Sequence, residues 1–223
     1  MKVIIFGATG MVGQGVLREC LLDGQVERVL LVGRSSIGVH HGKLQEIVHR
    51  DFFDFSSIEE SLSGYDACFF CLGVSSAGKK ERDYTRVTYD VTMAAAEVLA
   101  RKTPGITFIY VSGTGTDSSE HGRRMWARVK GRTENALLKM PLKAYMFRPG
   151  YIQPMHEIKS KTKLYSALYV VVAPMYPLLR RLAPTYVTTT EQLGRAMLCV
   201  AKRGAPKRVL ESEDINRCCD EVP

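Results

Sequence analysis

Three glycines near the start of the chain have the spacing of a phosphate-binding turn. They are Gly7, Gly10 and Gly13, with an apolar run before them at residues 2–6 and an amphipathic stretch after them. The first glycine permits the tight bend, the second lets the backbone approach a pyrophosphate, and the third lets the helix pack closely on the strand. The start of the helix then presents free amide hydrogens to the phosphates. The pattern predicts a dinucleotide site.

A basic residue follows the second apolar run, VLLVGRSS. About twenty positions after the glycines, an acidic residue would bond the ribose hydroxyls, whereas an arginine pairs with a 2′-phosphate. Arg34 stands at this point, with Ser35 and Ser36 as further hydroxyl donors. We therefore expect a preference for NADP(H), with NAD(H) as the alternative cofactor.

Two of the six cysteines, Cys68 and Cys71, have the spacing of half a metal site or of a redox pair. Residues 67–72 form an apolar run typical of a buried strand, in which positions three apart point to opposite faces. Cys218 and Cys219, in a polar tail, do not supply a second ligand pair. The sequence therefore predicts free thiols and no metal site.

Short apolar runs alternate with longer helical patterns, which indicates βαβ units. The expected strands are 2–6, 28–32, 46–49, 67–72, 107–111, 143–147 and 208–210. The expected helices are 11–22, 57–62, 83–102, 124–139, 164–182 and 190–202. This order predicts an α/β fold, a doubly wound Rossmann fold with a parallel sheet, in a single domain over residues 1–223.

Residues 150–188 depart from this alternation. They predict a small late insertion that covers the substrate side of the cofactor cleft, with a plain connector as the alternative. Lysines at 159, 161 and 163 and the apolar run up to residue 181 admit a second interpretation, contact with a membrane surface. Pro174 and Pro177 interrupt the run, so we expect no membrane-spanning helix.

The chain carries a net charge of +8, which would suit a nucleic-acid partner. The basic residues, however, are scattered in pairs such as Lys79–Lys80 and Arg123–Arg124, without an aromatic-interleaved patch. We therefore expect no nucleic-acid partner. The opening residues form too short an apolar run for a signal peptide, so a cytoplasmic location is expected.

Several further segments match one known family. They are GATGMVG at 7–13, VGR at 32–34, RDFFDFSSI at 50–58, CLG at 71–73, VSGTGTD at 111–117, VKGRTEN at 129–135 and FRPGYIQP at 147–154. Through them the chain resembles the atypical short-chain dehydrogenase/reductase family, in the small branch of Tat-interacting oxidoreductase-like proteins.

The resemblance implies contacts along the cofactor. Asp51 and Phe52 are expected beside the adenine, and Leu72 and Gly73 beneath the nicotinamide-side ribose. Together with the turn and the active site, the expected cofactor-binding residues are Gly7, Thr9, Gly10, Met11, Val12, Gly13, Arg34, Ser35, Asp51, Phe52, Leu72, Gly73, Lys130, Pro149 and Gly150.

The resemblance also implies an active site. Ser112 is expected to be the active-site serine, and Lys130 the active-site lysine that contacts the nicotinamide ribose. Pro149 and Gly150 are expected to line the nicotinamide pocket.

One position departs from the family pattern Tyr-x-x-x-Lys, because Trp126 stands four residues before Lys130. An indole N–H only donates and does not titrate in the useful range, so Trp126 cannot act as the general acid. It would instead bond a carbonyl or cover the nicotinamide. The candidates to replace the tyrosine are His121, Tyr151 and Tyr84.

Two functions remain open. The first is an oxidoreductase, an NADP(H)-dependent reductase of a small carbonyl-type substrate, with the proton supplied by another residue or by water. The second is a catalytically weak or inactive NADP(H)-binding regulatory or scaffold protein. Trp126 favours the second, whereas Ser112 and Lys130 favour the first. Epimerase chemistry is a distant third, because it also needs the tyrosine.

Overall fold

A seven-stranded parallel sheet forms the centre of the computed structural model, which describes residues 1–156, 158 and 184–220. The strands are β1 (Lys2–Phe6), β2 (Arg28–Gly33), β3 (Leu44–Val48), β4 (Ala67–Phe70), β5 (Thr107–Val111), β6 (Lys143–Arg148) and β9 (Val209–Glu211). Their order is β3-β2-β1-β4-β5-β6-β9, and every neighbouring pair is parallel. The strand order reverses between β1 and β4, which confirms the predicted doubly wound Rossmann fold.

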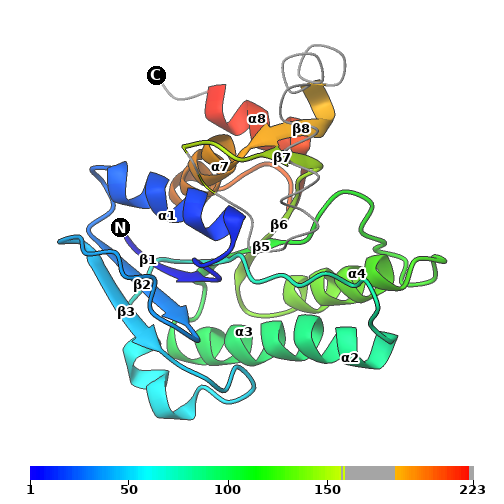
Figure 1. The fold of residues 1–223 in the computed structure, drawn as a ribbon, viewed down its shortest axis with the longest axis horizontal. Helices are drawn as coiled ribbons and strands as arrows, with labels where there is room; N and C mark the ends of the chain where they lie inside the picture. Colours follow the sequence, from blue (N-terminus) through cyan, green and yellow to red (C-terminus); the bar gives the residue numbers. More distant parts are fainter. Residues whose placement is uncertain (157, 159–183, 221–223) are drawn as a thin grey trace.

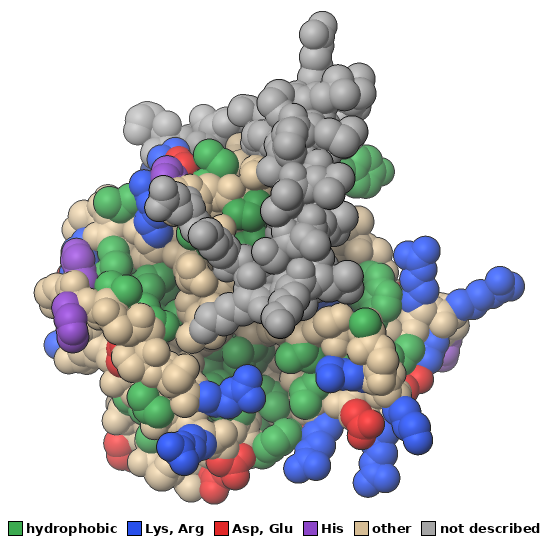
Figure 2. All heavy atoms as spheres, viewed as in Figure 1, with side chains coloured by type: hydrophobic (Ala, Val, Ile, Leu, Met, Phe, Trp, Pro, Cys, Tyr) green, Lys and Arg blue, Asp and Glu red, His purple; other side chains and the backbone are tan. Residues whose placement is uncertain are grey.

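Helices cover both faces of the sheet (Figure 1). One face carries α1 (Met11–Leu22), α7 (Thr190–Arg203) and α8 (Ser212–Asp220). The other carries α2 (Glu81–Thr85), the π-helical turn η2 (Arg86–Asp90), α3 (Val91–Lys102) and α4 (Met125–Leu138). Basic side chains gather on the side of the molecule where α2 and the start of α4 lie (Figure 2).

The central strands are buried on both faces, which explains why they are continuous apolar runs in the sequence. In β1, Val3 and Ile5 belong to the core beneath α1 and α7. Ile4 and Phe6 belong to the second core, beneath α3. Strand side chains alternate between faces, so each strand contributes to both cores.

Cys68 and Cys71 lie in different layers, as predicted. Cys68 is buried in the core beneath α3, and Cys71 packs against the core beneath α1. Burial raises the pKa of the Cys71 thiol to about 12, so this thiol stays protonated at neutral pH. Within the described residues, no group of three or more His, Cys, Asp or Glu side chains could hold a metal ion.

Four small elements were not predicted. They are the parallel pair β7 (Tyr151–Gln153) and β8 (Val187–Thr189), the 3₁₀ turn at 184–186 and the helix α8. Among the described side chains of α8, Ile215 and the partly buried Cys218 belong to the apolar core, so its sequence has the composition of a polar tail. Two short 3₁₀ helices, η1 (Ser56–Leu62) and η4 (Pro184–Tyr186), complete the described elements.

Two predictions lie outside the described residues. They are the helix at 164–182 and the membrane-surface interpretation of 159–181. The predicted cover at 150–188 is described only at its ends, where β7 and β8 pair. Among the helices that are described, none is both long and apolar enough to span a membrane.

The glycine turn brings the backbone of α1 against the end of β1. Gly7 has φ of +85°, a region that favours glycine. A Cβ added at Gly13 would lie 2.2 Å from the Gly7 carbonyl oxygen. Only a residue without a side chain permits this approach.

We therefore expect Gly13→Ala to lower the free energy of unfolding by about 1–3 kcal/mol, because the added methyl group overpacks the turn. Urea denaturation measures the change. Gly24→Ala is the matched control, since a Cβ there would meet nothing within 4 Å among the described residues. Equal losses in the two variants would contradict the close-approach argument.

Candidate functional site

The glycine turn lies at the carboxyl ends of β1 and β4. The N–H of Gly10 donates to the carbonyl of Gly7 at 2.9 Å, and α1 begins at the next residue. Among the described residues no side chain caps this helix, and its first turn holds no acidic residue. The N–H groups of Met11, Val12 and Gly13 precede the first possible intrahelical bond. They are therefore free to bind an anion such as a pyrophosphate.

A cavity of about 470 Å³ opens beside this turn. Its walls come from the segments that follow β1, β2, β3 and β4, which meet at the carboxyl edge of the sheet. Among the residues predicted for the cofactor, those that line it are Gly7, Thr9, Gly10, Arg34, Ser35, Phe52, Leu72 and Gly73. The structure thus brings together eight residues from four separate segments.

Three large apolar side chains line this cavity although they are exposed. Phe53, Val74 and Val87 are 43%, 44% and 39% exposed. The guanidinium of Arg86 lies 4.8 Å from the centre of the Phe53 ring. A flat heterocycle such as adenine would cover this apolar surface, because ligand pockets bury rings against apolar walls.

A second arginine, Arg50, also lines the cavity, and the sequence analysis missed it. Arg34 and Arg50 are both exposed, and neither forms an ion pair within the described part of the chain. Glu46 contributes one carboxylate to the same cavity, and its Oε1 accepts from the N–H of Ile37 at 3.4 Å. The only available sign of Arg50 was its place directly before the Asp51–Phe52 pair.

Asp51 and Phe52 differ in their surroundings. Phe52 is buried and lines the cavity. Asp51 is exposed, does not line the cavity, and accepts from the N–H of Phe53 at 2.9 Å. In this structure, Asp51 closes the turn that contains Phe52 and Phe53.

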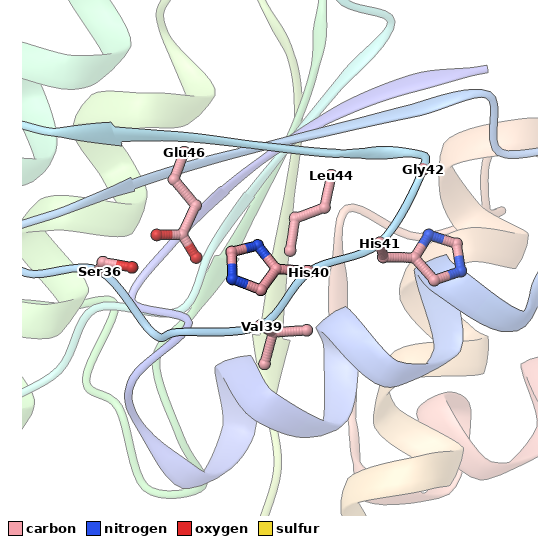
Figure 3. Close-up of a pocket in the computed structure, with 7 residues that line it drawn as sticks. All are labelled: Ser36, Val39, His40, His41, Gly42, Leu44 and Glu46. Atoms are coloured by element: carbon pink, nitrogen blue, oxygen red, sulfur yellow. The ribbon is translucent and has the colours of Figure 1, made fainter.

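A second hollow of about 600 Å³ adjoins the cavity through Glu46. Figure 3 shows the side chains of His40 and Glu46 directed into this hollow, with His41 turned away. The N–H of Lys43 donates to Nδ1 of His41 at 3.1 Å. Within the described chain these histidines join no group that could hold a metal, and we assign the hollow no chemistry.

Ser112, the predicted active-site serine, is buried at the end of β5 with 4% of its surface exposed. Its hydroxyl donates to Oε1 of Glu134 at 2.5 Å and lies 3.2 Å from the carbonyl oxygen of Phe147. Thr114, two residues later, is exposed and donates its hydroxyl to the carbonyl of Arg148 at 3.0 Å. The Ser112 proton is therefore engaged inside the protein.

The buried ion pair of Glu134 and Arg148 lies beneath this site, and the sequence analysis missed it. Glu134 is fully buried, and its carboxylate accepts from Nε and Nη2 of Arg148. A buried carboxylate needs such a partner because desolvation of a lone charge is costly. Glu134 stands four residues after Lys130, on the same face of α4, which was the available signal.

Lys130 reaches back from α4 to the end of β5. Its ammonium donates to the carbonyl of Ser112. Burial lowers the pKa of Lys130 to about 8, although the carboxylate of Glu134 opposes this shift. A Cβ added at Gly113 would lie 3.9 Å from Lys130 Nζ and 3.8 Å from the carbonyl oxygen of Pro149. Three predicted site residues, Ser112, Lys130 and Pro149, therefore converge.

Trp126 lies one turn before Lys130 and is half-buried, near Gly115. The predicted replacements for the tyrosine are in three different settings. His121 is exposed in the segment before α4, and Tyr84 is buried. The hydroxyl of Tyr151 donates to Oε1 of Gln153 at 2.9 Å.

Gly150 adjoins the two small strands. Its N–H donates to the hydroxyl of Ser212 at 2.7 Å. A Cβ here would lie 2.4 Å from the carbonyl oxygen of Tyr186, so the residues that directly precede β7 and β8 approach closely. This packing places Gly150 at the start of the segment that was predicted to cover the cleft.

Comparison with known proteins agrees with a nucleotide-binding cleft. A family model described as NAD(P)H-binding matches residues 7–165. Protein HTATIP2 of Rattus norvegicus is 28% identical over a stretch that covers 68% of this chain and 62% of the rat protein. Protein FMP52, mitochondrial, of Meyerozyma guilliermondii is 24% identical and covers 99% of this chain and 96% of its own.

Solved structures of low sequence identity share the fold. A UDP-glucose 4-epimerase has a TM-score of 0.71 at 14% identity, covering 97% of this chain and 80% of its own. The Bordetella bronchiseptica enzyme WbmF in complex with NAD+ has a TM-score of 0.67 at 15% identity, covering 99% and 77%. At this level of identity the likeness concerns the architecture alone.

Proposed function

Because this chain belongs to the NAD(P)H-binding family, we propose that it is an NADP(H)-dependent reductase of a small carbonyl-type compound. The observation that carries the proposal is the meeting of two features at one edge of the sheet. One is the cavity beside the glycine turn, and the other is Lys130, which bonds the end of the neighbouring strand β5. Together they would supply a dinucleotide cleft and a cation at its reaction end, the part around Ser112, Lys130 and Pro149 where the nicotinamide would lie.

The preference for the phosphorylated cofactor rests on the two arginines. Arg34 follows β2 and Arg50 follows β3, and both line the same cavity without ion-pair partners in the described chain. Guanidinium groups bind phosphate through charge-assisted hydrogen bonds. The single carboxylate of Glu46 leaves the cavity with an excess of positive charge, which favours a 2′-phosphate over a ribose hydroxyl.

We expect Arg34→Ala and Arg50→Ala each to weaken NADPH binding by about 1.5–3 kcal/mol, because each removes one charge-assisted contact. Isothermal titration calorimetry measures the loss. NADH serves as the internal control, since it lacks the 2′-phosphate and its affinity should change little. A parent protein that binds NADPH and NADH equally well would refute the preference.

The reaction end would work as follows when the nicotinamide cofactor is bound. The cofactor supplies the hydride, and this chain supplies orientation and charge. Lys130 holds a ribose hydroxyl with its ammonium group, and Pro149 borders the space beside it. Trp126, in the preceding turn of α4, would cover the ring, but its indole N–H does not ionise near neutral pH. Turnover is therefore expected to be slow, with the proton delivered by water or a neighbouring group.

Trp126→Tyr should raise the NADPH-dependent reduction of 4-nitrobenzaldehyde by about tenfold or more. A positioned general acid contributes roughly 10²- to 10⁴-fold, and position 126 lies one helical turn from Lys130. NADPH absorbance measures the rate. Trp126→Phe is the matched control, because it alters the same position without adding a phenol. If the parent already reduces the aldehyde rapidly and Trp126→Tyr lowers that rate, another residue already supplies the proton.

The lowered pKa of Lys130 predicts a pH dependence of cofactor binding. As the pH rises from 7 to 9, it passes the pKa of about 8 and the ammonium loses its proton. The NADPH affinity of the parent should therefore fall by up to about tenfold, whereas an ordinary lysine would stay charged. Fluorescence titration of NADPH at both pH values measures this.

Lys130→Arg is the control for that titration, because a guanidinium keeps its charge throughout this range. Its affinity should not change between pH 7 and pH 9. An equal fall in the parent and in Lys130→Arg would assign the effect to another group.

A second candidate function is supported by two observations. The tyrosine position holds Trp126, and the hydroxyl of Ser112 is committed to Glu134. Both suit a protein that binds NADP(H) in order to stabilise a surface for a partner. Tight NADPH binding without turnover in the parent and in Trp126→Tyr would favour this function over the reductase.

A further inference from the structure

Two basic pairs that are far apart in the sequence meet beside the reaction end of the cleft. Lys79 and Lys80 directly precede α2, and Arg123 and Arg124 directly precede α4. With Arg82 on α2 they form what we call the basic cluster, and all five side chains are exposed. In the sequence these two pairs are more than forty positions apart.

Arg128 holds the two segments side by side. Its Nη2 forms an ion pair with Oε2 of Glu81 at 2.6 Å, and its Nη1 donates to the carbonyl of Gly122 at 2.6 Å. Glu81 follows Lys80 in the chain, and Gly122 precedes Arg123. One guanidinium therefore ties the start of α2 to the segment before α4.

The cluster has an excess of positive charge. Within the described residues, none of its five side chains forms an ion pair. Four carboxylates lie in the same two segments. Glu81 is paired with Arg128, and Glu120 accepts from the amide of Asn135 at 2.7 Å. Asp117 accepts from the N–H of Gly122 at 2.6 Å, and Asp83 is exposed on α2. The five cations of the cluster still outnumber them. Figure 2 shows basic side chains gathered on this side of the molecule.

The position of the cluster follows from the chain that leads to it. After β4, Leu72 and Gly73 line the cofactor cavity, and the same segment continues to Lys79. On the other side, Arg124 precedes the first turn of α4, which carries Trp126, and Lys130 follows one turn later. The two segments therefore run from the reaction end to the cluster, whereas Arg34 and Arg50 belong to the opposite end beside β2 and β3.

We propose that the basic cluster binds an anionic group of the substrate, a phosphate or a carboxylate, while the carbonyl lies beside Lys130. This inference rests on the proposed reductase function and names its substrate class as small acidic carbonyl compounds. Cations that border a cleft concentrate anions there and strengthen their binding through charge-assisted hydrogen bonds. Selection by charge would complement the orienting groups of the reaction end, among which the described residues include Trp126 and Lys130.

Two aldehydes of nearly equal shape test the charge requirement. The probes are 4-carboxybenzaldehyde, which is anionic at neutral pH, and its uncharged methyl ester. With NADPH, the parent protein should favour the anion by about tenfold or more in kcat/KM. Raising the salt concentration should reduce this preference, because these cations are exposed.

Charge reversal locates the preference. Lys79→Glu with Lys80→Glu, and separately Arg123→Glu with Arg124→Glu, should abolish the preference and leave reduction of the ester unchanged. The matched control is Lys139→Glu with Lys143→Glu, which reverses two exposed cations beyond the opposite end of α4, roughly 20 Å away. A parent that treats both aldehydes alike, or a control that loses the preference equally, would overturn the inference.

Calorimetry separates this inference from the reductase function. Titration of 4-carboxybenzaldehyde into the NADP+ complex, in which no reduction occurs, should show binding to the parent and to the control, and much weaker binding to both charge-reversed variants. This binding pattern in a protein that shows no turnover would contradict the reductase function and support the anion site. Equal binding in all four proteins would remove the anion site even if turnover is observed.

Discussion

One buried carboxylate organises the reaction end of this fold. Glu134 lies at the centre of α4's inner face, where an unpaired charge would be costly. Arg148 at the end of β6 and the hydroxyl of Ser112 at the end of β5 both satisfy it. These bonds fix two strand ends against one helix. They also turn the Ser112 hydroxyl inward and leave its backbone carbonyl for Lys130.

This arrangement separates positioning from proton transfer. Lys130 gains a fixed place and a lowered pKa from its burial, yet the turn before it carries an indole instead of a phenol. Under the proposed reductase function, the site would retain groups that orient a nicotinamide, and position 126 would lack the phenol that protonates an alkoxide. Positively charged side chains lie toward both ends of the proposed cleft. Arg34 and Arg50 are at one end, and the basic cluster is toward the other.

Much of the fold and part of the site could be predicted because their signals are local. Strands buried on both faces read as continuous apolar runs, and glycine spacing alone indicates the turn after β1. The small elements β7, β8 and α8 escaped prediction because each contributes only a few buried residues. Arg50 escaped because an exposed arginine has no local pattern that separates it from a solvated one.

The sequence by itself determined the parallel sheet, the glycine turn and the absence of a tyrosine at position 126. Each of these depends on residues that are neighbours along the chain. Only the tertiary structure decided that Ser112 bonds Glu134, and that the guanidinium of Arg128 joins Glu81, beside Lys79–Lys80, to Gly122, beside Arg123–Arg124. The bonds of Ser112 to Glu134 and of Arg128 to Glu81 join residues more than twenty positions apart. Their partners are set by how helices pack across the sheet edge, which no spacing in the sequence records.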